Sequence, residues 1–272
     1  MLIAIDTGGT KTLVASFHRD GKPHECYRFL TPNDPREYLE VVSTFLKAHY
    51  DLAKIHAIVI AVPGMVRDNV AMWCDNLGWK NFDIADGLKK MGITPRVFLE
   101  NDANLAGLGE VRGLAKIPQL ALYVTVSTGI GTGIIINGHL VPALSNSEAG
   151  HSVLAYKKQY QEWEVFASGK ALREKYGKMA KDIPINDTRS WQEIAEKISV
   201  GLLAIIPALQ PETIIIGGSI GTYFNRYGDF LKEILSSQLS EHLIESLIIP
   251  AKHPEEAVIY GCYCYGSDKL AR

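Results

Sequence analysis

The chain has 272 residues, of which 47% are hydrophobic and 21% charged, values typical of a globular protein with one large or two modest domains. Its formal net charge of −2 offers no basic field to a nucleic acid or an anionic membrane, so neither is expected as a partner. No apolar stretch is long enough to span a membrane, and the N-terminal MLIAIDTGGTK lacks the features of a signal peptide. We therefore expect a cytoplasmic protein.

The cysteines predict neither a metal site nor disulfides. They are Cys26, Cys74, Cys262 and Cys264, and the lone C-x-C lacks the second pair that tetrahedral zinc needs. Free thiols, buried or half-buried, are expected in a reducing compartment.

Apolar runs predict four short strands in the first half of the chain, over Leu2–Ile5, Thr12–Phe17, Ala57–Val62 and Val97–Leu99. The glycines of TGGT, between the first two runs, permit the positive φ of a tight hairpin. Apolar residues at helical intervals predict a helix over 35–50, and another helix should start near Asp102.

The second half repeats this scheme, with strands predicted over Ala121–Val126, Ile134–Ile136 and Thr213–Ile216. The glycine-rich GIGTG is expected to form the turn between the first two strands. Helical patterns cover 163–178 and 190–209. Such self-similarity predicts two related α/β lobes with mixed sheets flanked by helices and a cleft between them.

Two loops have the character of phosphate-binding turns, DTGGTK at 6–11 and STGIGTG at 127–133. Glycine lets backbone amides approach a ligand closely, and Thr hydroxyls add further donors. Either loop alone would more often be a plain hairpin, but matching positions in two lobes favour phosphate. Neither fits a Walker A motif or a dinucleotide fingerprint, which disfavours a Rossmann dehydrogenase.

Taken in order, DTGGTK, ENDANLAGLGE, STGIGTGI, EAGH and IIIGGS resemble the ROK family of sugar kinases and repressors. The resemblance runs from residue 2 to about residue 220 and extends plausibly to the helix around YGCYCYG. It implies a two-lobe actin-like ATPase fold of the ribonuclease-H type, with ATP and sugar in the interlobe cleft. The expected lobes are 1–112, with a C-terminal helix of about 255–272 packing back on it, and 113–254.

The resemblance also implies the residues that hold the sugar: Gly64, Asn101, Asp102, Glu148, His151 and Glu164. Within the Glu100–Asp102 cluster, a helix cap explains one polar residue but not three. Asp102 is expected to orient the sugar hydroxyl and accept its proton, whereas Glu100 is expected to support the turn. Asn76 is a weaker candidate, because Asn in such a position is often only a turn residue.

The residues expected to hold ATP are Asp6, Gly8, Gly9, Thr10, Lys11, Thr128, Gly129, Gly131, Thr132, Gly217, Gly218 and Ser219. Asp6 is expected to reach the phosphates through water and Mg²⁺, because direct contact between two anions is repulsive.

One departure from the family pattern follows His151. ROK kinases commonly carry a loop C-x-C-G-x-x-G-C there, whose cysteines bind structural zinc together with that His. The present stretch, SVLAYKKQYQEW at 152–163, has no cysteine, so no zinc is expected. We expect packing to hold it, through Tyr156, Tyr160 and Trp163.

The resemblance implies an ATP-dependent hexose kinase, with conversion of glucose to glucose 6-phosphate the leading expectation. The alternatives are a kinase for N-acetylhexosamine, fructose or mannose, and, from another class, a sugar-sensing repressor. Repressors place a helix-turn-helix ahead of the first motif, and Asp6 leaves no room for one here. Asp102 and both phosphate loops argue against a catalytically silent sugar-binding protein. A homodimer is also implied.

Overall fold

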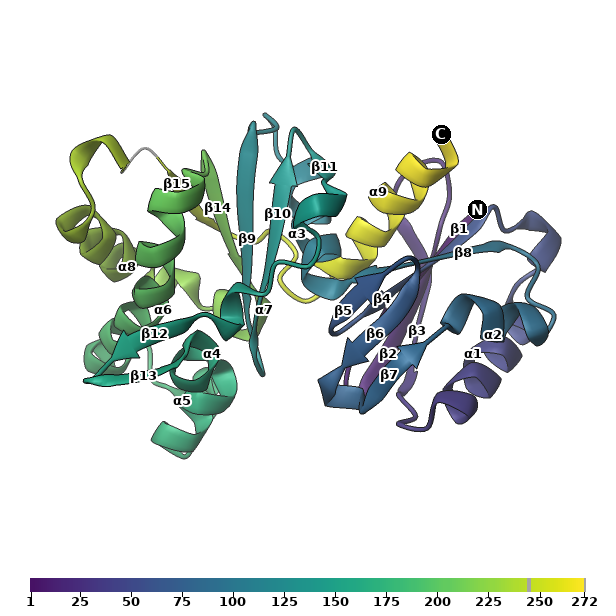
Figure 1. Ribbon diagram of the computed structural model, residues 1–272, viewed down its shortest axis with the longest axis horizontal. Helices are drawn as coiled ribbons and strands as arrows, with labels where there is room; N and C mark the ends of the chain where they lie inside the picture. Colours follow the sequence, from purple (N-terminus) through teal and green to yellow (C-terminus); the bar gives the residue numbers. More distant parts are fainter. Residues whose placement is uncertain (244–245, 272) are drawn as a thin grey trace. The chain divides into compact units, whose positions relative to one another are not determined.

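Figure 1 shows the computed structural model of the chain, which describes residues 1–243 and 246–271. The chain divides into two compact units, one formed by Met1–Arg112 with Glu256–Arg272 and the other by Gly113–Glu255. Over these described residues, every helix is too short or too polar to cross a membrane.

The first unit is built on a five-stranded sheet in the order β3-β2-β1-β4-β8, and a small sheet β5-β6-β7 follows β4 in the chain. Strands β1, β4 and β8 are parallel, and β2 and β3 are antiparallel to their neighbours. The strands are β1 (Leu2–Thr7), β2 (Lys11–Phe17), β3 (Pro23–Leu30), β4 (Ala57–Val62), β5 (Met65–Arg67), β6 (Val70–Cys74), β7 (Trp79–Phe82) and β8 (Arg96–Asn101). The helices are α1 (Pro35–His49), α2 (Ile84–Lys90), α3 (Asp102–Arg112) and α9 (Ala257–Ala271).

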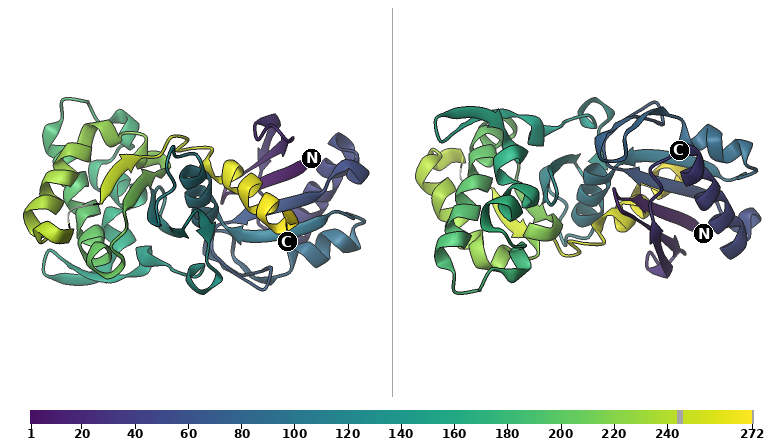
Figure 2. Two further views of the ribbon diagram at one scale, coloured as in Figure 1. Left: turned by 90° about the horizontal axis from the view of Figure 1, so that it is seen from above. Right: turned by 90° about the horizontal axis from the view of Figure 1, so that it is seen from below.

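Alternating side chains of β1 and β4 bury both faces of this sheet, because successive residues of a strand point to opposite sides. Ile3, Ile5 and Ile58 belong to the cluster that packs with α1 and α2. Leu2 and Val59 belong to the other cluster, with residues of α3 and α9. Figure 2 shows α9 lying along α3 in both views, so the C-terminal segment completes the core of the first unit.

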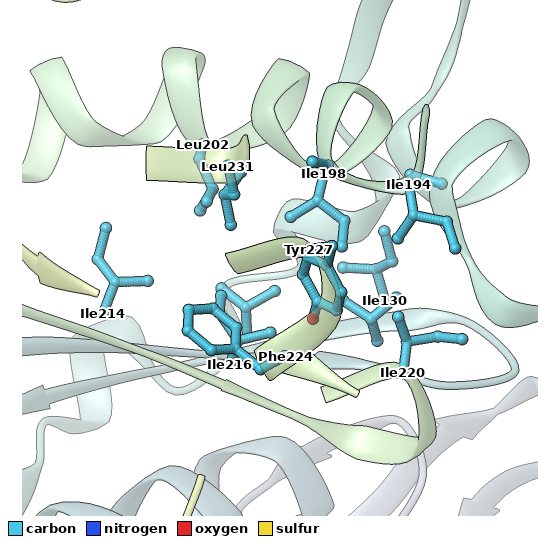
Figure 3. Packing of buried hydrophobic residues seen from close by; sticks show 14 of the residues in the cluster. Ile130, Ile194, Ile198, Leu202, Ile214, Ile216, Ile220, Phe224, Tyr227 and Leu231 are labelled. Carbon is cyan, nitrogen blue, oxygen red and sulfur yellow. The ribbon is translucent and has the colours of Figure 1, made fainter. Parts of the chain in front are cut away.

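The second unit has a five-stranded sheet in the order β11-β10-β9-β14-β15, in which β9, β14 and β15 are parallel, and a separate hairpin β12-β13. Its strands are β9 (Leu120–Val126), β10 (Ile130–Ile136), β11 (His139–Leu140), β12 (Val153–Tyr156), β13 (Gln159–Glu162), β14 (Thr213–Gly217) and β15 (Leu247–Pro250). Its helices are α4 (Trp163–Ala167), α5 (Gly169–Tyr176), α6 (Thr188–Leu209), α7 (Gly218–Gly221) and α8 (Phe224–Gln238). Figure 3 shows the core, where Ile214 and Ile216 of β14 meet Ile198 of α6 and Tyr227 and Leu231 of α8.

Most predicted elements are confirmed, and β4 has the predicted bounds. Three expectations about local geometry are wrong. Only Ser127–Gly129 of the second glycine loop form the turn, because β10 already begins at Ile130. The helix predicted over 163–178 is interrupted at Ser168, whose extended backbone ends α4 and whose hydroxyl oxygen caps α5. Gly8 and Gly9 do not have positive φ.

The cysteines also differ in one respect from the expectation. All four are free, and Cys74 and Cys262 are buried, but Cys26 is exposed because it lies on β3 at the edge of the sheet.

The contact between α3 and α9 predicts a strong requirement for glycine at position 261. A Cβ there would lie 1.7 Å from the carbonyl oxygen of Leu105, so Gly261→Ala must push the helices apart. We expect the free energy of unfolding to fall by about 3 kcal/mol, measured by urea denaturation. Ser267→Ala, at an exposed position of α9, is the matched control. Equal stability of the two variants would contradict this account of the interface.

Candidate functional site

In the first unit, the candidate residues gather where parallel strands end. Asp6 of β1 pairs with Ala61 of β4, and Val62 of β4 pairs with Asn101 of β8. The carboxyl ends of these strands therefore share one edge of the sheet, which is where ligands usually bind in open α/β sheets.

Asn101 joins two turns at this edge. Its Nδ2 donates to the carbonyl oxygen of Gly64 at 3.0 Å, and its Oδ1 accepts from the backbone N–H of Asn104 at 3.0 Å. The second bond is a helix cap, so Asn101 rather than Asp102 caps α3. Gly64 has φ +145°, and a Cβ on it would lie 2.1 Å from the carbonyl oxygen of Trp73. The close approach expected at Gly64 is thus to the protein's own backbone.

Glu100 supports this turn, as the sequence predicts. Its Oε1 accepts from the backbone N–H of Asn101 at 2.9 Å and from the Asn104 side-chain amide at 3.0 Å. Burial raises the pKa of this carboxyl, and the two hydrogen bonds oppose that change.

Asp102 is the remaining member of the cluster and the first residue of α3. Its Oδ1 accepts from the backbone N–H of Ala103 at 2.8 Å, and the residue is partly exposed. Asn101 supplies the cap at the Asn104 N–H, and the carboxylate of Asp102, at the edge of the sheet, accepts from a different amide of the first turn.

Asp6 is electrostatically coupled to Asp102. The pKa of Asp6 is raised to about 7, mainly by burial and also by the charge of Asp102, while Arg28 opposes both. A buried carboxyl beside a second carboxylate forms a donor set that a hard divalent cation would satisfy, since Mg²⁺ prefers one or two carboxylates with phosphates and waters. The residues therefore fit the expected Mg²⁺.

The first glycine loop presents exposed Gly9, Thr10 and Lys11. Two hydrogen bonds stabilise the shape of this loop. The Gly8 N–H donates to the Lys11 carbonyl oxygen at 3.0 Å, and the Thr31 hydroxyl donates to the Gly8 carbonyl oxygen at 2.8 Å. Asn76 lies against Gly9, its Cβ 3.5 Å from where a Cβ on Gly9 would stand.

In the second unit, Ser127 ties together the loops that follow β9 and β14. Its hydroxyl oxygen accepts from the Ser219 N–H at 3.0 Å, and its carbonyl oxygen accepts from the Gly169 N–H at 2.6 Å. Gly218 is packed against Ser127: it has φ +78°, and a Cβ on it would lie 2.6 Å from the Ser127 hydroxyl oxygen. Gly217 is equally confined, because a Cβ there would lie 2.2 Å from the Tyr123 hydroxyl.

A cavity of about 720 Å³ opens at these loops. Thr128 and Ser219, both expected to bind ATP, line it together with Lys170, Arg173 and Tyr223. Lys170, Arg173 and Tyr223 are not among the residues predicted from the sequence. Exposed cations on a helix are usually only solvated, and nothing in the sequence indicates that α5 begins beside Ser127.

The three sugar-contact candidates of this unit lie together. Glu164 Oε2 accepts from the Ile130 N–H at 3.2 Å, and Glu164 Oε1 lies 3.9 Å from His151 Nδ1. Burial raises the pKa of Glu148, while the charge of His151 lowers it and that of Glu164 raises it. Gly150 permits this arrangement, since a Cβ there would lie 2.0 Å from the Ile130 carbonyl oxygen.

Gly131 and Thr132 lie within β10 rather than in a turn. Thr132 is buried, its hydroxyl donates to the Ser147 carbonyl oxygen at 3.4 Å, and it accepts from the Ala149 N–H at 3.4 Å. In this structure Thr132 thus supports the segment that carries Glu148, and its contact with ATP stays a prediction.

Comparison with known proteins gives consistent matches. A sequence profile of the ROK family matches residues 2–266. A putative fructokinase from Bacillus subtilis (strain 168) is 30% identical over 96% of this chain and 93% of its own length. A xylose repressor from the same strain is 28% identical over 71% of this chain, and the match spans only 57% of the repressor.

Among solved structures, a ROK family glucokinase from Streptomyces griseus, in complex with glucose and AMPPNP, has a TM-score of 0.80 at 21% identity, over 96% of this chain and 97% of the glucokinase. The match confirms the predicted fold class, an actin-like ATPase fold built from mixed sheets flanked by helices.

The coupling of the two carboxylates in the first unit can be tested directly. Asp102→Asn should lower the pKa of Asp6, because removal of a nearby negative charge favours the ionised form. The measurement is an NMR titration of the Asp6 carboxyl carbon, assigned with Asp6→Asn, and Asp86→Asn on α2 is the control. An unchanged pKa of Asp6 in the Asp102→Asn variant would contradict the coupling.

The raised pKa of Asp6 also predicts how the free energy of unfolding changes with pH. A carboxyl whose pKa rises from 3.8 to about 7 on folding stabilises the native state fully below pH 3.8 and loses that contribution as the pH rises through 7. Asp6→Asn should therefore flatten the fall in stability over this range, measured without ligand by urea denaturation. A pH profile identical to that of the wild type would contradict the raised pKa.

Proposed function

Since the chain belongs to the ROK family, whose profile covers nearly all of it, we propose that it is an ATP-dependent sugar kinase. The reaction transfers the γ-phosphate of ATP to a sugar hydroxyl, with glucose, yielding glucose 6-phosphate, as the first acceptor to test. The observation that carries the proposal is the placement of Asp102, a carboxylate at the end of β8 whose helix is capped by another residue.

Asp102 acts as the general base in this proposal. A sugar hydroxyl is a poor nucleophile at neutral pH, so a carboxylate within hydrogen-bond reach orients it and accepts its proton as the bond to phosphorus forms. Asn101 holds Asp102 in place through its bonds to Gly64 and Asn104. Its amide has two N–H groups and a carbonyl with two lone pairs, so it can also contact a neighbouring sugar hydroxyl.

The remaining half of the chemistry is the placement of ATP. The cavity beside Ser127 is large enough for the nucleotide, with Thr128 and Ser219 as donors and Lys170 and Arg173 as charges that would compensate phosphate. Lys181 also lines it, as do two acids, Glu174 and Glu255, so its lining is mixed with a small excess of positive charge. The exposed backbone of Gly9 and Thr10, the Thr10 hydroxyl and Lys11 are proposed to contact the phosphates. The Gly8 N–H is already used within the loop, where it donates to the Lys11 carbonyl. Asp6 holds Mg²⁺ through water, and that ion, when bound, neutralises phosphate charge during transfer.

The choice of sugar rests on Glu148, His151 and Glu164 in this proposal. Carboxylates and an imidazole can pair with several hydroxyls, and a sugar that leaves one of these groups unpaired is rejected. The relatives carry names of fructokinase and glucokinase, so fructose, mannose and N-acetylhexosamines stand beside glucose as acceptors.

The decisive experiment is a sugar panel scored by ADP release with ATP and Mg²⁺. We expect one or two hexoses to stimulate ADP release well above the rate without sugar. No stimulation by any hexose, N-acetylhexosamine or pentose would contradict the kinase proposal.

The similarity to a xylose repressor supports a second candidate, a sugar-sensing regulatory protein. Specific DNA retention at low salt that is released by a sugar would favour that candidate over the kinase.

Asp102→Asn tests the base. The change is nearly isosteric and leaves the Asn101 cap untouched, so we expect the melting temperature to stay the same while kcat falls about 10²–10⁴-fold. Sugar affinity should change far less, because an amide can still hydrogen-bond the hydroxyl. Steady-state kinetics and thermal unfolding measure both, and a fully active Asn variant would refute the catalytic assignment.

Gly129→Ala tests the sugar subsite in the second unit. A Cβ at 129 would lie 2.6 Å from Glu164 Oε2, so the flexible carboxylate must move while the backbone is spared. We expect the KM for the sugar to rise about tenfold, which corresponds to the loss of one hydrogen bond to a charged group. The melting temperature should change little. Lys158→Ala, at an exposed site of the β12-β13 turn, is the control. Unchanged sugar kinetics in Gly129→Ala would remove Glu164 from the subsite.

A further inference from the structure

His151 has a carboxylate partner where related kinases commonly have a zinc ion. Its Nδ1 lies 2.9 Å from Glu162 Oε2, at the end of the hairpin β12-β13 that takes the place of the cysteine-rich loop. The hydrogen bond to Glu162 is the main cause of the raised pKa of His151. The other acids that face this ring are Glu148 and Glu164.

The hairpin holds Glu162 at this position. Val153 pairs with Glu162 across the two strands, and the Trp163 N–H donates to the Ser152 carbonyl oxygen at 2.9 Å. These contacts bring the last residue of β13 back beside the segment that carries His151.

Packing anchors the hairpin to the core of the second unit. The Trp163 indole is buried and donates to the Lys197 carbonyl oxygen at 3.1 Å, and the Tyr156 ring stacks on Phe166 with centroids 4.4 Å apart. The expectation that Tyr160 also contributes is wrong, because its side chain is 83% exposed. These contacts anchor the hairpin that carries Glu162 to the core of the second unit.

The partner determines which nitrogen of the ring carries the proton. An ionised carboxylate only accepts hydrogen bonds, so Nδ1 must donate to Glu162. In the neutral ring Nε2 is then the acceptor, and a sugar hydroxyl could donate to it. Without such a partner, nothing fixes the tautomer or the plane of a side chain that is 57% exposed.

We propose that Glu162 is a positioning residue for the sugar subsite: its carboxylate fixes the orientation and the Nδ1–H tautomer of His151 and so presents Nε2 to a sugar hydroxyl. Glu162 thereby orients the ring in the way that second-shell carboxylates orient histidines in metal sites. This inference rests on the proposed sugar-kinase function, but its first test does not need activity.

A competing arrangement is a bound divalent ion. His151, Glu162 and Glu164 each place one ligand atom within 4.8 Å of the others, so the three could enclose a metal. A metal would take the lone pair of Nδ1 and abolish the Nδ1–H proton, which makes the two arrangements distinguishable.

The first test is nitrogen NMR of the histidine rings, in protein without an affinity tag and at a pH that keeps His151 neutral. The His151 signals are assigned by their loss in His151→Gln. We expect the Nδ1–H tautomer in the wild type and in the exposed control Gln159→Ala, and the Nε2–H form or a mixture in Glu162→Ala. A wild type with its proton on Nε2, or no change in Glu162→Ala, would overturn the proposal.

The second test is kinetic and uses the sugar that the panel identifies. Glu162→Ala should raise the KM for sugar about 10–100-fold, the usual cost of losing such a partner, and leave the KM for ATP unchanged. Glu162→Gln keeps an acceptor oxygen and should recover much of the loss. A rise in both KM values, with a lower melting temperature and no recovery in Glu162→Gln, would mean that Glu162 only supports the hairpin.

Elemental analysis after dialysis against a chelator completes the design. Less than one-tenth of an equivalent of zinc per chain, about the level of adventitious metal, is expected. One tightly held zinc that is lost in Glu162→Ala would overturn the proposal in favour of a metal site. If the wild type phosphorylates no sugar, the kinase proposal fails, whereas the NMR result still decides how His151 is held.

Discussion

The pairing of β8 with β4 is the constraint on which the candidate site of the first unit depends. It sets Asn101 opposite Val62, so the turn at Gly64 lies within reach of the Asn101 amide. The same amide group caps α3 through its oxygen. One side chain thus fixes a turn and a helix start together, and this sets the position of Asp102, whose carboxylate also accepts from the Ala103 N–H. A shift of the register by one residue would separate these groups, because alternate side chains point to opposite faces.

In the second unit, a smaller residue, Ser127, links two segments at the ends of parallel strands. β9 and β14 are parallel neighbours, and Ser127, just beyond β9, accepts from the N–H of Ser219, just beyond β14. Its carbonyl oxygen also accepts from the first residue of α5. In both units a polar residue after a parallel strand links two turns, which leaves neighbouring side chains at the edge of the sheet available to a ligand. Gly218 is needed because the turn at Ser127 lies so close, and Gly217 because the Tyr123 side chain of β9 lies against it.

Local patterns were sufficient to predict most of this fold, and tertiary contacts account for the rest. Apolar runs located β4 and β9 because buried parallel strands need unbroken hydrophobic residues. The break at Ser168 was not predicted, since the helical pattern continues through it. The Ser168 hydroxyl caps α5, and the Gly169 N–H donates to the Ser127 carbonyl oxygen, so both contacts stabilise the bend. Lys170 and Arg173 were missed for the same reason. The sequence predicts a functional role for the polar cluster at 100–102, and that role stays a prediction. Which member makes the cap depends on Gly64, 37 residues away.

The acids around His151 show why the sugar cannot be named from residue types alone. Glu148, Glu162 and Glu164 all face the ring, and burial already raises the pKa of Glu148. Three carboxylates so close together destabilise the native state unless positive charge or hydrogen-bond donors offset them, because like charges in a partly buried site repel. His151 supplies part of that compensation, and hydroxyl donors of a bound sugar would supply more. Under the proposed function, the preferred sugar is the one whose hydroxyls pair with the acids that the histidine does not compensate, and the proposed role of Glu162 makes that choice depend on the orientation of the ring.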